Sequence, residues 1–169
     1  EPTRNTTPES YELHGYFARM AEAGCRYLVM EVSSQAIKLH RTDGILFDYG
    51  VFTNLSPDHI GPNEHADFAE VTAGASCPVL TFGLEKPADF QGKNLHYLSE
   101  DGFVGLEFDV SGKASLPVRA GIPGRFNASN ALAAISVCSQ LNLPKEALSR
   151  GLEHIHVNGR MEIAYASQR

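Results

Sequence analysis

Two apolar runs, residues 27–32 and 47–55, constrain the fold of this chain more than any other feature. Each run is almost continuously apolar rather than alternating, which is typical of a strand covered on both faces. Apolar residues at helical spacing over 10–24 come directly before the first run. Because strands and helices alternate, we predict an α/β fold with a mostly parallel sheet flanked by helices.

The helix predicted over 10–24 has recognisable ends. Thr7 before Pro8 fits an N-cap followed by proline at the first helical position. Gly24 fits a C-terminal stop, because glycine adopts the left-handed conformation that ends many helices.

The second half of the chain has a different pattern. Segments 95–98, 104–110 and 115–118 alternate apolar and polar residues, with a turn at 111–113, and predict a small antiparallel β patch. The other elements expected are a short strand at 78–82, a long helix from Gly124 to about 142, a helix over 145–152 and a final strand over 160–165.

Composition excludes several classes of protein. The 169 residues are 43% hydrophobic and 20% charged, as in an ordinary globular domain. A net charge of −6 opposes electrostatic binding to nucleic acid or to an anionic membrane, and no apolar run approaches the roughly 20 residues of a membrane helix. The three widely spaced cysteines fit neither a disulfide framework nor a zinc site, so we expect a reducing cytoplasm.

Polar residues that carry chemistry follow both apolar runs. Glu31 ends the first run, and Asn54, Asp58 and His59 end or follow the second. Ligands of open α/β sheets bind at the carboxyl ends of the strands. Carboxylate oxygens with one imidazole suit magnesium or manganese better than zinc. The alternative is that Glu31 pairs with an arginine and that His59 is a loop histidine.

Three other groups of residues could bind anions or bases. Thr6 and Thr7 stand at a predicted helix start, which favours phosphate or carboxylate, although simple capping explains them too. Arg41 is either an anion clamp or a surface charge. At the start of the long helix, Arg125, Asn127 and Asn130 could cap the helix or contact a base. The chain contains no phosphate-binding glycine loop of its own.

Five motifs occur in one order along the chain. They are Asn-Thr-Thr-Pro at 5–8, Met-Glu-Val-Ser-Ser at 30–34, Arg41, Thr-Asn-Leu with Asp-His at 53–59, and Gly-Arg-Phe-Asn with Asn-Ala-Leu-Ala-Ala at 124–134. Together they resemble the central ATP-binding domain of the Mur ligases, closest to the tripeptide-synthetase branch. The resemblance spans nearly the whole chain and implies a P-loop-type α/β domain of a bacterial, cytoplasmic enzyme of peptidoglycan biosynthesis.

The resemblance also implies a reaction and a set of site residues. ATP would phosphorylate the D-Glu carboxylate of UDP-N-acetylmuramoyl-L-Ala-D-Glu, and the amine of lysine or meso-diaminopimelate would attack the acyl phosphate. Magnesium would offset the charge between carboxylate and triphosphate. By this likeness the catalytic magnesium ligands are Glu31 and His59, the substrate-binding residues are Thr6, Thr7, Ser33 and Arg41, and the nucleotide-binding residues are Asn54, Arg125, Asn127 and Asn130.

The chain departs from the family pattern in ways that bear on its organisation. The UDP-binding domain and the phosphate loop would precede Glu1, and the amino-acid-binding domain would follow Arg169. A lysine-bearing helix and a strand are expected after the segment 65–70 but are missing, so we expect that Glu70 and Val71 are not neighbours in the parent protein.

Two other functions remain open. One is a different Mur-like ligase, of the folylpolyglutamate or cyanophycin synthetase type, against which the Asn-Thr-Thr-Pro motif argues. The other is a non-catalytic binding module of the same fold.

Overall fold

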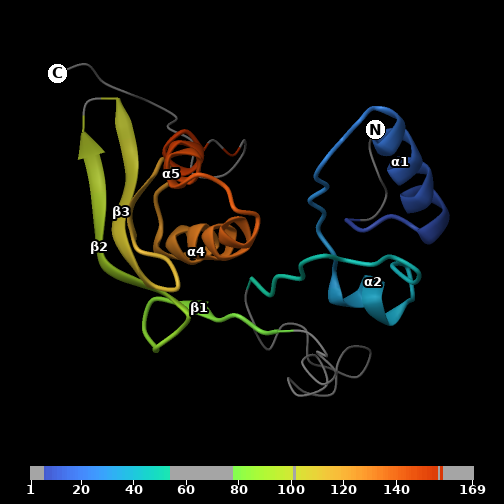
Figure 1. Ribbon diagram of the computed structural model, residues 1–169, viewed down its shortest axis with the longest axis horizontal. Helices are drawn as coiled ribbons and strands as arrows, with labels where there is room; N and C mark the ends of the chain where they lie inside the picture. The colour runs from blue at the N-terminus through green and yellow to red at the C-terminus, as the bar shows by residue number, and fades with distance from the viewer. Residues whose placement is uncertain (1–5, 54–77, 101, 156, 158–169) are drawn as a thin grey trace. The chain divides into compact units, whose positions relative to one another are not determined.

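The computed structural model describes residues 6–53, 78–100, 102–155 and 157 (Figure 1). The chain divides into two compact units, one formed by residues 1–50 and 54–74 and the other by 51–53 and 75–169. Three predictions lie outside the described residues: the polar residues at 54–59, the join at 70/71 and the strand over 160–165.

In the first unit, helix α1 (Ser10–Glu22) confirms the predicted helix. Its C-terminal end is a Schellman motif: the N–H of Cys25 donates to the Met20 carbonyl, and the N–H of Gly24 donates to the Ala21 carbonyl, both at 3.0 Å. Gly24 has φ +75°, which glycine adopts without strain, so the prediction for the helix end is confirmed.

The prediction for the start of α1 is wrong. Glu9, not Thr7, is the N-cap, and Glu9 and Glu12 form a capping box in which the Glu9 N–H donates to the Glu12 carboxylate. Thr7 cannot cap the helix because its hydroxyl is engaged by a segment more than twenty residues away.

The two apolar runs also differ from their predictions. Neither 27–32 nor the described part of the second run is a strand, and several side chains in or beside them are exposed, with Val29 at 94%. A strand exists only where a neighbour supplies ladder hydrogen bonds, and the described residues supply none to these runs. The short helix α2 (Ser34–Lys38) follows the first run and was not predicted.

The second unit contains a four-stranded mixed sheet in the order β1-β2-β3-β4. Its strands are β1 (Phe82–Gly83), β2 (Phe90–Glu100), β3 (Phe103–Gly112) and β4 (Leu116–Ala120). β1 pairs with β2 in parallel, and the other two pairs are antiparallel. The antiparallel patch and the α/β class are therefore confirmed, whereas the described sheet is mainly antiparallel rather than mostly parallel.

Asp89 holds the segment that leads into β1 through contacts with Thr81. The strand observed here, Phe82–Gly83, is shorter than the strand predicted at 78–82. The Asp89 carboxylate accepts from the backbone N–H of Thr81 at 2.9 Å and from the Thr81 hydroxyl at 3.0 Å, and it pairs with Lys113 at 3.3 Å. These donors hold the pKa of Asp89 below its usual value, the Thr81 backbone N–H contributing most. The Thr81 N–H thus bonds to a side chain instead of a strand partner.

Two helices, α4 (Arg125–Gln140) and α5 (Lys145–Glu153), pack against one face of the sheet, as Figure 1 shows, and confirm both predicted helices. Alternate residues of β3, such as Leu106 and Phe108, are buried with Leu132 and Ile135 of α4, while Glu107 lies exposed on the opposite face. A Cβ on Gly105 would collide with the Ala120 carbonyl oxygen, so β3 and β4 can approach this closely only with glycine there. This core forms a platform for the first turn of α4.

Candidate functional site

Thr7 links two distant segments of the first unit. Its hydroxyl donates to the Glu31 carbonyl at 3.1 Å and accepts from the Ser33 N–H at 3.1 Å, and the residue is only 1% exposed. The Thr7 hydroxyl therefore acts as donor and as acceptor in hydrogen bonds within the protein. Thr7 therefore sets the position of Glu31 and Ser33 at the end of the first apolar run.

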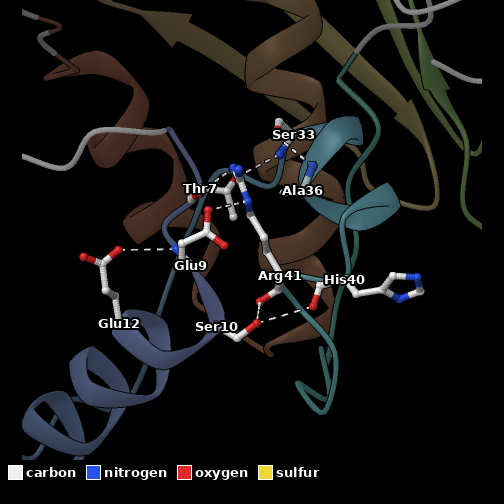
Figure 2. Close-up of polar contacts among 8 residues, drawn as sticks. All are labelled: Thr7, Glu9, Ser10, Glu12, Ser33, Ala36, His40 and Arg41. Carbon is white, nitrogen blue, oxygen red and sulfur yellow. Dashed lines mark hydrogen bonds and ion pairs between the residues drawn. The ribbon is translucent and has the colours of Figure 1, made fainter. Parts of the chain in front are cut away.

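Ser33 begins helix α2. Its hydroxyl accepts from the Ala36 N–H at 3.2 Å, which is the N-cap contact that starts the helix (Figure 2). This contact uses an oxygen lone pair, and no acceptor for the hydroxyl proton of Ser33 occurs among the described residues, so the proton can be donated to a ligand.

Arg41 is held by the residues that lead into α1. Its Nη1 donates to the Thr7 carbonyl at 3.3 Å, and its Nε lies 3.0 Å from the Glu9 carboxylate. The Ser10 hydroxyl donates to the Arg41 carbonyl at 3.0 Å, as Figure 2 shows. Segment 7–10 thus contacts Arg41 through backbone and side chains, although about thirty residues separate them in sequence.

The structure therefore brings together Thr7, Ser33 and Arg41, three of the four residues predicted to bind substrate. Thr6, the fourth, is exposed and adjacent to Thr7 in the chain. Sequence reasoning missed Glu9 and Ser10. The Glu9-x-x-Glu12 spacing was a signal for a capping box, but nothing in the sequence pairs Glu9 with Arg41.

The predicted metal ligands are described only in part. Thr7 holds the backbone of Glu31, and the Glu31 side chain is exposed. Within residues 6–53, 78–100 and 102–155 no cation pairs with its carboxylate, and no cluster of three potential metal ligands occurs. An unpaired carboxylate is a hard oxygen donor that fits magnesium. His59 lies outside the described residues, so its meeting with Glu31 stays a prediction.

In the second unit, three of the residues predicted to bind the nucleotide lie in the first two turns of α4. Asn127 is buried; its Nδ2 donates to the Pro123 carbonyl at 2.7 Å, and its Oδ1 accepts from Asn130 Nδ2 at 3.2 Å. The exposed Arg125 pairs with Glu85 at 2.8 Å, a partner without a sequence signal. Asn127 therefore braces the turn before the helix. No donor to the amide oxygen of Asn130 occurs among the described residues, so this oxygen can accept from a ligand. Asn54 lies outside the described residues.

Comparisons with known proteins agree with these motifs. The family model described as "Mur ligase middle domain" matches residues 1–73 and 62–138. A Clostridium perfringens protein named UDP-N-acetylmuramoyl-L-alanyl-D-glutamate--2,6-diaminopimelate ligase is 34% identical over 189 residues, covering 94% of this chain and 38% of the relative. A Streptococcus thermophilus protein named as the corresponding L-lysine ligase is 35% identical over 176 residues, covering 94% of this chain and 36% of the relative.

A solved structure shares the fold. It is titled as that of a UDP-N-acetylmuramoyl-L-alanyl-D-glutamate--2,6-diaminopimelate ligase and superposes with a TM-score of 0.79 at 22% identity, covering 99% of this chain and 40% of that chain. The chain thus spans less than half the length of the relatives it matches. From the family match and the arrangement of its motifs, the chain belongs to the Mur ligase family and carries that family's middle domain.

Proposed function

We propose that the protein containing this chain is an ATP-dependent ligase that adds a diamino acid to UDP-N-acetylmuramoyl-L-Ala-D-Glu, in the bacterial cytoplasm, for peptidoglycan biosynthesis. The observation that carries the proposal is the assembly of Thr7, Ser33 and Arg41, which come from three separate family motifs. The names of the relatives support the same substrate class. They include both lysine-adding and diaminopimelate-adding proteins, so either amino acid is a candidate.

Each residue of the first unit has a distinct part in this proposal. Arg41 supplies positive charge to the anionic muramoyl-peptide substrate, and the hydroxyls of Ser33 and Thr6 donate hydrogen bonds to it. Thr7 acts indirectly, because its hydroxyl is committed to Glu31 and Ser33. Glu31, with His59, would hold magnesium, which when bound lowers the repulsion between the substrate carboxylate and the triphosphate.

The nucleotide is assigned to the second unit. Asn127 keeps the first turn of α4 in place, so that Asn130 and Arg125 can contact the nucleotide. Asn54 would orient the segment after the second apolar run near the phosphates.

The domain organisation belongs to the proposal. We place the missing lysine-bearing helix and strand between Glu70 and Val71 of the parent protein, and the remaining domains outside this chain. Two observations support an interruption: the family model matches in two pieces that share residues 62–73, and the alignment with the Clostridium relative is 189 residues long although this chain has only 169. A tryptic peptide from the natural protein that joins Glu70 directly to Val71 would overturn it.

The test of the function uses the full-length protein. Phosphate release from ATP should require magnesium, UDP-N-acetylmuramoyl-L-Ala-D-Glu and either lysine or meso-diaminopimelate together. Glu31→Gln should keep the melting temperature and reduce turnover by more than about tenfold, since a neutral amide is a weaker ligand for a hard cation. A full-length protein without magnesium-dependent ATP turnover would instead be a non-catalytic module of this fold.

A further inference from the structure

Glu9 makes a contact that its role as a helix cap does not require. Its carboxylate lies 3.0 Å from Nε of Arg41, across a separation of 32 positions in the chain, and it is the one anionic group paired with this guanidinium in the described part of the structure. The Arg41 side chain is 15% exposed and that of Glu9 59%, so a largely buried guanidinium has a carboxylate partner on its solvent side. A buried charge without such a partner is costly.

The contact depends on charge rather than on a directed hydrogen bond. Nε of Arg41 is buried and has no hydrogen-bond partner within the described residues, even though the Glu9 oxygen is close enough for an ion pair. A neutral side chain of the same shape would therefore not replace the Glu9 carboxylate.

Within the described part of the chain, two contacts hold the guanidinium of Arg41 and none involves its third nitrogen. Nε faces Glu9 and Nη1 donates to the Thr7 carbonyl, as Figure 2 shows. Nη2 has no acceptor among the residues that the structure describes. Arginine has many rotamers, and fixing one of them before a ligand arrives reduces the entropy lost on binding.

We propose that Glu9 is a positioning residue for substrate binding: its carboxylate holds Arg41 in the one orientation that presents Nη2 to the anionic substrate. This inference rests on the proposed function, in which Arg41 contacts UDP-N-acetylmuramoyl-L-Ala-D-Glu. Glu9 itself touches Arg41 and does not contact the substrate.

Variants of the full-length protein can separate positioning from helix capping. Glu9→Gln keeps the length of the side chain but removes its charge. Glu9→Asp keeps the charge and a good N-cap, but it is one methylene shorter and does not reach Nε. Glu12→Ala is the matched control, because it breaks the capping box and does not touch Arg41.

The measurements are calorimetric binding of UDP-N-acetylmuramoyl-L-Ala-D-Glu and the KM values for this substrate and for ATP. Glu9→Gln and Glu9→Asp should each weaken binding of the dipeptide substrate roughly three- to tenfold, the cost of ordering one flexible side chain, and leave the KM for ATP unchanged. Glu12→Ala should lower the melting temperature without weakening this binding.

Unchanged or tighter substrate binding in both Glu9 variants would overturn the inference while leaving the proposed function intact. Equal losses for ATP and for the dipeptide substrate would also overturn it, because they would indicate a general structural defect. If the wild-type protein did not bind the dipeptide substrate at all, the proposed function would fail, and the inference with it.

Discussion

Replacing Thr7 by valine should loosen the segment that carries Glu31 and Ser33. Valine has nearly the shape of threonine, so the buried volume is kept while the hydroxyl between Glu31 and Ser33 is lost. Each of the two hydrogen bonds has a net value of about 0.5–1.5 kcal/mol, so the loss of both should cost about 1–3 kcal/mol. Thr7→Ser is the matched control, because it keeps the hydroxyl and removes only a methyl group.

Amide hydrogen exchange of the full-length protein measures this effect at the residue concerned. The Ser33 amide donates to the Thr7 oxygen, so its exchange should become roughly tenfold to a hundredfold faster in Thr7→Val, at about 1.4 kcal/mol per tenfold change. The control should exchange close to the wild-type rate. Equal protection of Ser33 in the valine and serine variants would refute the bridge and return Thr7 to the role of a direct substrate contact.

Two further predictions concern stability. Gly105→Ala should lower the free energy of unfolding by about 1–3 kcal/mol, because the new methyl group would collide with the Ala120 backbone. Gly15→Ala in helix α1 should raise the free energy of unfolding by about 0.5–1 kcal/mol, because its methyl group meets nothing within 4 Å and alanine favours the helix. Urea unfolding measures both changes, and equal effects of the two substitutions would contradict the packing argument. Because the pKa of Asp89 is lowered in the folded protein, the ionised carboxylate contributes its full stabilisation above the ordinary pKa of 3.8 and loses it as the pH falls through the lower folded-state pKa. The difference in unfolding free energy between the wild type and Asp89→Asn should therefore shrink in that acid range. A difference that stays constant down to the lowest pH would refute this prediction.

Much of the local structure could be predicted because its causes are local. Helix α1 follows from the spacing of its apolar residues and from Gly24, and the hairpin of β2 and β3 follows from alternation along 95–110. The start of α4 follows from the glycine and polar residues at 124–127. In each case, neighbours within a few positions decide the conformation.

The two apolar runs show where local pattern is insufficient. Their composition is that of buried strands, yet within the described residues they have no ladder partner, and Val29 is exposed. An apolar, β-branched composition favours a strand, but a strand also needs a neighbouring strand to pair with. The sequence of the segment alone does not determine where that neighbour lies.

The candidate site divides in the same way. The residues predicted to bind anions, metal and nucleotide were visible in the sequence as motifs, and the order of these motifs pointed to the family. Thr7 illustrates what the motifs did not contain: proline at position 8 favours a cap, in which the hydroxyl oxygen accepts from a helix N–H. In the structure that oxygen accepts from the Ser33 N–H instead, and its proton is donated to the Glu31 carbonyl. The pairing of Glu9 with Arg41 likewise depends on the return of the chain after helix α2, because a contact between residues 32 positions apart is set by the path of the backbone and not by either residue's neighbours.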